Sequence, residues 1–314
     1  MAYGNGTGAS FGIASESTFN TYVAPDHFSE FNSESLNFRP NRLQGMGLRA
    51  GGVFGRKQRR VTATSDAGGD VTLDLTSTTA GLLLAHCTGS FPSKAAGAFV
   101  FTPGDLAGHS FTAQVGVPLL SGTVDPKTLT GCKVTDWELA VPNAGFVTLK
   151  ATIDAAGFTR STALATPSYT AATAPFHFAQ ATLKIGGSTV AYVQDVTLTF
   201  ANALKTDRQN VGGAGIKAEQ IHNGFRALTG TMNAEFVSTT AYAAFLADTD
   251  SSLQLTLTSG SDSLDVLIPC IRFDGDAPQV GGPEVVMQSL PFTALDDGTN
   301  AVYTITYTTT DAAL

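Results

Sequence analysis

The stretch "DVTLDLTSTTAGLLLAHC" (residues 70–87) carries the pattern that decides the fold. Its first part alternates apolar and polar residues, so that Val71, Leu73 and Leu75 share one face of an extended chain. Such alternation is typical of a half-buried β-strand. The tetrapeptide STTA and a run rich in Ala and Leu follow, which favour a short helix capped by a Ser or Thr hydroxyl. The stretch therefore predicts a strand, a junction at STTA and a helix.

The same unit occurs a second time in "MNAEFVSTTAYAAFLADT" (residues 232–249), where STTA lies 161 positions later. Further matches keep the same order along the chain. They pair Leu36 with Leu198, Phe38 with Phe200, Asn41 with Asn202, Gly69 with Gly230, Asp70 with Thr231, and Cys132 with Cys270. This ordered series predicts a tandem duplication of one strand-rich unit.

The boundary between the two copies is expected in "TRSTALATPSYTAATAP" (residues 159–175), a small and polar stretch that suits a linker. We therefore predict a first unit at residues 1–165 and a second unit at residues 166–314. The spacing between matched residues falls from 161 to 138 positions, so the first unit has about 23 extra residues. We assign these to an insertion at about residues 90–130.

Alternation also dominates outside the repeated unit, which makes the predicted fold class mainly β. Examples are "GFVTLKATI" (145–153), "VQDVTLTFAN" (193–202), "SLQLTLTS" (252–259) and "AVYTITYTTT" (301–310). Val, Ile, Thr and aromatic residues are enriched in such strands, and Gly or Pro clusters separate them. Helical patterns are confined to the two short runs that follow STTA, so each unit is expected to carry one short helix.

The composition limits the possible partners. Charged residues make up 14% of the chain, against roughly 25% in an average globular domain. The resulting surface of Thr, Ser, Ala and Gly suits burial against partner subunits, and it equally suits an ordinary Thr-rich β protein. The net charge of −8 argues against tight binding of nucleic acid, because such binding depends on neutralising phosphates.

Motifs of enzymes, metal sites and cofactor sites are not found in the sequence. Cys87, Cys132 and Cys270 form no CxxC pair, the five histidines form no HxH or HExxH pattern, and no GxSxG or GxGxxG motif is present. The N-terminal residues do not read as a signal peptide, and no run of 18 apolar residues predicts a membrane span. We therefore expect a non-enzymatic protein without cofactor or metal, in a reducing compartment and away from membranes.

Two stretches resemble the major tail tube protein of long-tailed, non-contractile (siphovirus-type) phages. In the first, the matching residues are Gly12, Ile13, Ala14, Pro25, Phe28, Phe31, Ser33, Glu34, Ser35 and Leu36. The second is "TLTGCKVTDWELAV" (residues 128–141). The resemblance implies two tandem β-sandwich units, each flanked by one short α-helix. It also implies stacked rings around a lumen through which double-stranded DNA passes during ejection.

The same resemblance implies the partners and the location of the protein. Two units in one chain imply a homotrimeric ring with pseudo-six-fold symmetry, and a hexamer is the alternative. The further partners would be the tape measure protein, the tail terminator and the tail-tip proteins. The protein would be part of the virion tail, assembled in the host cytoplasm. A surface β-sandwich module that binds a ligand such as carbohydrate remains the rival interpretation.

One basic loop is a candidate contact between rings. The run "GRKQRR" (residues 55–60) supplies Arg56, Lys57, Arg59 and Arg60 after a glycine-rich stretch that can bend freely. It could be a nucleic-acid patch, a solvated loop, or a stacking loop whose Arg side chains pair with carboxylates of the next ring. The counterpart in the second unit contains Lys205, Arg208 and Lys217.

The polar face of the strand before each STTA is a candidate for the wall of the lumen. It contains Asp70, Thr72 and Asp74 in the first unit, and Asn233 and Glu235 in the second. Carboxylates on such a wall would repel DNA phosphates by about 1 kcal/mol or less per pair in salt water. Repeated around every ring, this repulsion would keep DNA from adhering. An ordinary solvent-facing strand is the alternative.

Overall fold

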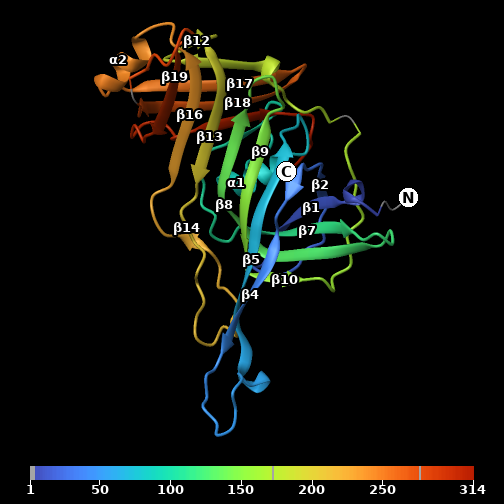
Figure 1. Cartoon of the computed structure of the whole chain (residues 1–314). Helices are drawn as coiled ribbons and strands as arrows, with labels where there is room; N and C mark the ends of the chain where they lie inside the picture. The colour runs from blue at the N-terminus through green and yellow to red at the C-terminus, as the bar shows by residue number, and fades with distance from the viewer. Residues whose placement is uncertain (1–3, 172, 276) are drawn as a thin grey trace.

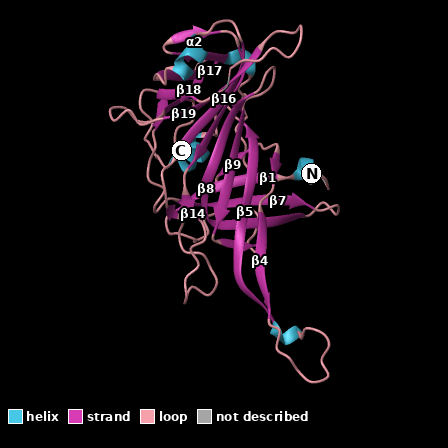
Figure 2. Ribbon diagram, turned by 60° about the vertical axis from the view of Figure 1, so that its left-hand side comes forward, coloured by secondary structure: helices cyan, strands magenta, loops and turns pink. Residues whose placement is uncertain are grey.

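The computed structural model describes residues 4–171, 173–275 and 277–314 and shows an elongated, mainly β molecule (Figure 1). The predicted fold class is confirmed: strands dominate, and two short α-helices accompany them. A long hairpin projects at one end, and helix α2 lies at the other end (Figures 1 and 2). Neither described helix has the length and apolar character that a membrane crossing requires.

The first half contains ten strands and one α-helix. They are β1 (Ser10–Glu16), β2 (His27–Ser29), β3 (Ser33–Glu34), β4 (Asn37–Gln44), β5 (Arg60–Asp74), α1 (Gly81–Thr88), β6 (Ala98–Phe101), β7 (Ser110–Pro118), β8 (Val124–Val141), β9 (Thr148–Ala155) and β10 (Gly157–Thr159). Short 3₁₀ turns occur at Gly6–Gly8 and Lys57–Arg59. The antiparallel pairing runs β1–β7–β8–β9–β5–β4.

The second half contains ten strands, a second α-helix and a 3₁₀ turn at Phe178–Gln180. They are β11 (Ala181–Ile185), β12 (Ser188–Val190), β13 (Val193–Ala201), β14 (Leu204–Lys205), β15 (Ile221–His222), β16 (Ala227–Glu235), α2 (Thr240–Leu246), β17 (Ser251–Ser259), β18 (Asp262–Phe273), β19 (Met287–Ala294) and β20 (Thr304–Thr308). The pairing runs β11–β17–β18–β19–β16–β13, so each strand takes the position of its first-half counterpart.

One long strand in each half belongs to two layers. The first part of β8 pairs with β7 and β10, and its last part pairs with β9. The first part of β18 pairs with β17 and β20, and its last part pairs with β19. A bulge lets each strand bend from one layer into the other, as β-bulges bend strands generally.

The two bulges occur at equivalent positions. Phe111 and Ala113 of β7 face Cys132 and Leu129, whereas Ser251 and Leu253 of β17 face Ile271 and Ile268. The register therefore makes Cys132 equivalent to Ile271, one residue away from the predicted match with Cys270. The sequence match was wrong by one residue because β8 has another irregularity just beyond, between Val134 and Asp136.

The two halves share one sheet. Strand β13 pairs with the last part of β8, which gives a continuous antiparallel run β4–β5–β9–β8–β13–β16–β19–β18. One side of this eight-stranded sheet packs on the core, which includes Val71, Leu73, Trp137 and Phe200. Trp137 stacks on Phe200 with a centroid distance of 3.6 Å, so the single Trp anchors the junction between the halves.

The helices follow the two STTA segments, as predicted, but their caps differ from the prediction. The N-cap of α1 is Ala80 and that of α2 is Thr239, and neither accepts a side-chain hydrogen bond. The Thr79 N–H donates instead to the Asp311 carboxylate at 2.6 Å. The C-terminal segment supplies this acceptor because it crosses the start of α1, and every residue of α1 is buried.

The segment between α1 and β7 (residues 89–109) is longer than its counterpart between α2 and β17 (residues 247–250). It contains β6, which pairs with β20 of the second half. The predicted insertion at 90–130 also includes β7 and the start of β8. These strands are not extra chain, because they have counterparts in β17 and β18. The extra chain thus extends the outer sheet of the other half.

Candidate assembly surfaces

The predicted lumen residues lie together on one side of the eight-stranded sheet. We call this side the open face, because it points away from the core. Asp70, Thr72 and Asp74 of β5 alternate with buried Val71 and Leu73. Asn233 and Glu235 of β16 alternate in the same way with buried Met232 and Ala234. Strands β9, β8 and β13 lie between β5 and β16, so the sheet brings the two polar sets onto one surface.

Cross-strand register shows how polar this surface is. One row across the sheet reads Thr72, Lys150, Glu138, Thr199, Thr229, Thr293 and Arg272. Carboxylates on the same face include Asp70, Asp74, Asp136, Glu138, Asp195 and Glu235. The open face is therefore rich in hydroxyls and carries an excess of negative charge over its strands.

Hydrogen bonds hold several of these carboxylates. Partial burial disfavours the charged form of Asp70, but the Thr152 hydroxyl at 2.8 Å and the Lys150 ammonium at 3.1 Å lower its pKa below the usual value. The Asp74 carboxylate accepts a hydrogen bond from Asn32 at 2.7 Å, and Asn233 donates to Asp195 at 2.8 Å. The face is thus a fixed array of charges and not a set of free side chains.

The predicted stacking residues of the first half lie at the end of the projecting hairpin. Lys57, Arg59 and Arg60 are exposed there and Arg56 is half-buried, and a single turn of 3₁₀ helix at Lys57–Arg59 orders part of the loop. We call residues 45–59 the hairpin tip. Four large apolar side chains of the tip are also 87–99% exposed to solvent: Met46, Leu48, Val53 and Phe54. Contiguous exposed apolar residues mark interaction surfaces in folded proteins.

The predicted stacking residues of the second half are engaged within the chain. Lys205 pairs with Asp207 at 2.8 Å, and Arg208 donates to the Glu219 carbonyl. The Lys217 side chain is 4% exposed and pairs with Asp66 and Asp154 of the first half. Burial opposes the charged form of Lys217, but these two carboxylates raise its pKa. Lys217 is thus a link between the halves, and its predicted stacking role has no support in this arrangement.

Sequence patterns missed a second buried cation, Lys133 of β8. Its ammonium donates to the Leu106 carbonyl at 2.6 Å, to the Gln220 carbonyl at 2.9 Å and to the Glu219 carboxylate at 2.7 Å. Burial lowers the pKa of Lys133 in spite of Glu219. No local signal identifies this network, because its members come from three segments that are far apart in the sequence. Together with Lys217, it docks residues 202–226, which we call the docked loop, onto the first half.

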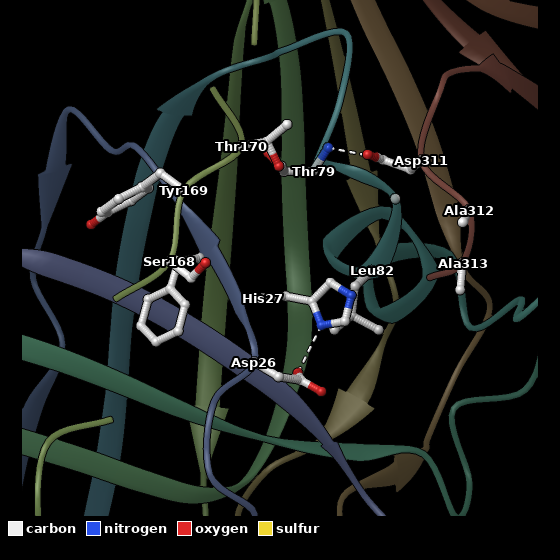
Figure 3. A pocket seen from close by; sticks show the side chains of 12 residues that line it. Asp26, His27, Thr79, Leu82, Ser168, Tyr169, Thr170, Asp311, Ala312 and Ala313 are labelled. Carbon is white, nitrogen blue, oxygen red and sulfur yellow. Dashed lines mark hydrogen bonds and ion pairs between the residues drawn. The ribbon is translucent and has the colours of Figure 1, made fainter. Parts of the chain in front are cut away.

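A cleft of about 270 Å³ lies between the start of α1, the C-terminal segment and residues 168–170 (Figure 3). It contains Asp26, His27 and Ser168, which are residue types of a hydrolase triad. Asp26 contacts the His27 imidazole at 2.7 Å, but their side chains are 70% and 32% exposed. Within the described part of the chain no hydrogen bond joins His27 to Ser168. A triad requires that bond between base and nucleophile, so the cleft holds no assembled nucleophile.

Metal chemistry has no candidate position on these surfaces either. Across residues 4–171, 173–275 and 277–314, no group of three His, Cys, Asp or Glu side chains is arranged to hold a metal ion. Cys87, Cys132 and Cys270 are buried and unpaired, and burial raises the pKa of each thiol. The described residues also present three contact surfaces: a polar open face, an apolar and basic tip, and sheet edges.

No individual curated protein matches the chain. The family described as "Phage tail tube protein" matches residues 6–294, a range that includes the first half from residue 6, the hairpin, the docked loop and the second half through β19. Because that match covers nearly the whole chain, the coarser part of the predicted resemblance is confirmed: this chain belongs to the phage tail tube protein family.

Proposed function

We propose that the chain is the major tail tube subunit of a long-tailed, non-contractile phage. Three copies form a ring, rings stack into a tube, and double-stranded DNA passes through the lumen during ejection. Residues 1–165 and 166–314 act as two copies of one tube unit. The observation that carries the proposal is the eight-stranded sheet, in which two four-stranded sets with the same pairing order are joined edge to edge.

The free ends of that sheet support self-assembly. Strand β4 pairs on one side with β5, and within the described residues nothing pairs with its other side. Arg272 and Phe273, at the end of β18, pair with β19 alone in the same described part of the chain. Unpaired strand edges attract further strands, and closure into a barrel removes them. Copies joined edge to edge around a ring would satisfy both ends.

The number of copies follows from the number of units. If each chain supplies two near-equal units, three chains give a ring with pseudo-six-fold symmetry. Three chains of eight strands each would contribute 24 strands to the barrel. Barrels of 16–18 strands already leave an aqueous channel, so this barrel would enclose a wide lumen.

The open face suits the wall of that lumen. Its hydroxyls and carboxylates would be wetted, and its negative charge would repel phosphate, which favours passage without adhesion. In this proposal Asp70, Thr72, Asp74, Asn233 and Glu235 line the channel. Before DNA enters, the same wall would contact the tape measure protein.

The ends of the molecule suit head-to-tail stacking. Residues 1–165 contain 12 basic and 12 acidic residues, whereas residues 166–314 contain 6 and 14, so the net charge of −8 belongs to the second half. Six of the basic residues lie between residues 42 and 60, where no acidic residue occurs. The basic tip and α2 lie at opposite ends (Figures 1 and 2). A contact between unlike surfaces repeats without limit along an axis, as a tube requires.

The remaining partners follow from this geometry. Each end of a tube leaves one set of stacking surfaces uncovered, and these would bind the tail terminator at one end and the tail-tip proteins at the other. Assembly in the host cytoplasm is compatible with three free thiols.

Electron microscopy and mass measurement test the proposal. Concentrated purified protein, examined by negative stain, is expected to form rings or tubes with a central hole. Native mass spectrometry of single rings is expected to give three chains of 32.5 kDa. A measured mass of six chains per ring would show that the ring is a hexamer and not a trimer. Monomers that fail to assemble at high concentration, even with tail-tip extract as initiator, would reject the tube.

A further inference from the structure

The junction between the two halves shows how the sheet edges of two such units can pair. In it, Phe200 of β13 lies opposite Trp137 of β8, and Ala201 lies opposite Asp136. The Asn202 N–H continues the pairing by donating to the Thr135 carbonyl at 2.8 Å. Alternate N–H groups of a strand point to the same side, so those of Leu198, Phe200 and Asn202 point toward β8.

The equivalent edge of β4 has no partner strand within the described residues, and its N–H groups are occupied by side chains. The Phe38 N–H donates to the Asn37 side-chain oxygen at 2.8 Å. The Leu36 N–H donates to the Glu34 carboxylate at 2.7 Å, and Lys127 holds that carboxylate at 2.9 Å. The next position on this edge is Pro40, which has no N–H. The edge is therefore protected in the single chain.

The register of the sheet identifies equivalent residues in the two halves. Phe38 faces Ala67 on β5, and Phe200 faces Leu228 on β16. Ala67 and Leu228 each precede a matched glycine, Gly69 or Gly230, by two residues, so Phe38 is the counterpart of Phe200.

The same reasoning applies to the other edge. Asp136 faces Thr152, and the Asp274 N–H bonds to the Pro291 carbonyl. Thr152 and Pro291 face the matched residues Asp70 and Thr231. Asp274 is thus the counterpart of Asp136, and Gly275 that of Trp137.

We propose that the protected edge of β4 receives the segment that follows β18 in a neighbouring copy, in the register of the β8–β13 junction. Arg39 then lies opposite Asp274, Phe38 opposite Gly275 and Leu36 opposite Ala277. Asn37 and Glu34 release the two N–H groups when the incoming carbonyls replace them. The inference rests on the proposed tube function and adds to it the partner segment, the register and a protecting device.

Two observations favour this partner. Residues 136–141 form a strand next to β13, whereas residues 277–280 after β18 form none. The second segment lacks the neighbour that the first one has, and a strand gains its hydrogen bonds only from such a neighbour. In addition, Arg39 and Asp274 are opposite charges that would meet on the open face, where Asp274 already accepts a hydrogen bond from Thr293 at 2.6 Å.

Disulfide trapping tests the register. The pair Arg39→Cys and Asp274→Cys would occupy a non-hydrogen-bonded position, where opposite Cβ atoms lie about 4.5–5.5 Å apart, within reach of a disulfide. The native cysteines are buried, at most 7% exposed, and should not interfere. Mild oxidation of assembled tubes is expected to link chains into a ladder that ends at three. The matched control is Asn41→Cys with Asp274→Cys, which shifts the register by two residues and should link at least tenfold less.

The outcomes separate the two proposals. If tubes form normally but disulfides form better through the control pair, or through neither pair, the proposed register is wrong. The proposal that the chain forms a tube would still stand. Absence of rings and tubes from the unsubstituted protein would overturn the tube, and this inference with it.

The protecting device has its own test. Asn37→Ala removes the acceptor that occupies the Phe38 N–H, so the lag before assembly, followed by light scattering, is expected to shorten several-fold. Asn41→Ala on the same strand is the control, since the Asn41 side chain bonds to the Thr64 hydroxyl and not to an edge N–H. Equal lags in the two variants would show that Asn37 does not protect the edge.

Discussion

At the scale of single residues, His86 shows how burial fixes a protonation state. Its side chain lies in α1, packed against Phe111 and Phe91 at 4.6 and 5.0 Å, and Ser15 is its hydrogen-bond partner at 3.0 Å. Burial, together with the nearby charges of His109 and Lys133, lowers the pKa of His86 from 6.5 to about 3. The folded chain therefore keeps this imidazole neutral, whereas the unfolded chain protonates it near pH 6.5.

Because the folded pKa is depressed, stability is complete above pH 6.5 and falls as the pH drops toward 3. We expect the free energy of unfolding to decrease by about 2 kcal/mol between pH 7 and pH 5, measured by urea denaturation. His86→Gln should flatten this dependence. If the free energy of unfolding of His86→Gln still decreases as steeply with falling pH, other titratable groups cause the decrease.

Lys217 is the second residue whose environment decides its role. Replacement by Met would leave Asp66 and Asp154 close together without their cation. Breaking a buried pair in this way costs about 3 kcal/mol or more. Lys205→Met, which breaks an exposed pair with Asp207, should cost much less, because solvent screens that pair. Equal losses in the two variants would contradict a linking role for Lys217.

At the scale of elements, the two hairpin-like connections show how equivalent segments acquire different tasks. The connection from β13 to β16 folds back as the docked loop, tied by Lys133 and Lys217. The connection from β4 to β5 projects as the hairpin tip, with Met46, Leu48, Val53 and Phe54 exposed. Since the tip has basic and apolar groups but few contacts of its own, its surface is available for another molecule.

Charge reversal at the tip tests that availability. Arg56→Glu combined with Arg59→Glu is expected to leave rings and thermal stability unchanged but to shorten tubes severalfold, because a basic surface would meet the acidic second half of the next ring. Tube lengths are measured by electron microscopy. Lys184→Glu with Arg160→Glu gives the same change in net charge away from the tip and should leave tube length unaltered. Tubes of normal length in the tip variant would remove it from the stacking contact.

At the scale of the whole molecule, the shared sheet joins the two units through paired strands. Strand β13 pairs with β8, and β6 pairs with β20. The docked loop contacts the first half through the Lys217–Asp154 ion pair. These links bring the polar residues of β5 and β16 onto one open face although they are about 160 positions apart. The charge of the open face is therefore a property of the whole sheet and not of one strand.

Changing the sign of that charge tests whether the open face lines the channel. Asp74→Lys with Glu235→Lys should still yield tubes, but these tubes should retain short duplex DNA in a salt-dependent way, because added cations bind phosphates. Fluorescence anisotropy of labelled duplex measures the retention. Asp262→Lys with Asp297→Lys, outside the open face, provides the same change of charge. Equal retention by both variants would place the open face outside the lumen.

The sequence by itself determined the local features of this protein. Alternation in "DVTLDLTS" and its relatives specified mainly β structure with one buried face, and the STTA segments specified two strand-to-helix junctions. Both signals are short-range, because a strand repeats every two residues and a helix every 3.6. The polar set on β5 and β16 could also be identified, since burial of one face leaves the other to polar residues.

Tertiary structure alone decided which segments meet. The hydrogen bond from the Thr79 N–H to Asp311, the pairing of β6 with β20 and the burial of Lys133 and Lys217 all join residues far apart in the chain. The basic residues of the two units are alike in sequence, yet the first set projects at the tip, whereas in the second set Lys217 is buried against the first half. Such outcomes depend on the free energy of packing two surfaces against each other, and no periodicity within a single segment encodes that energy.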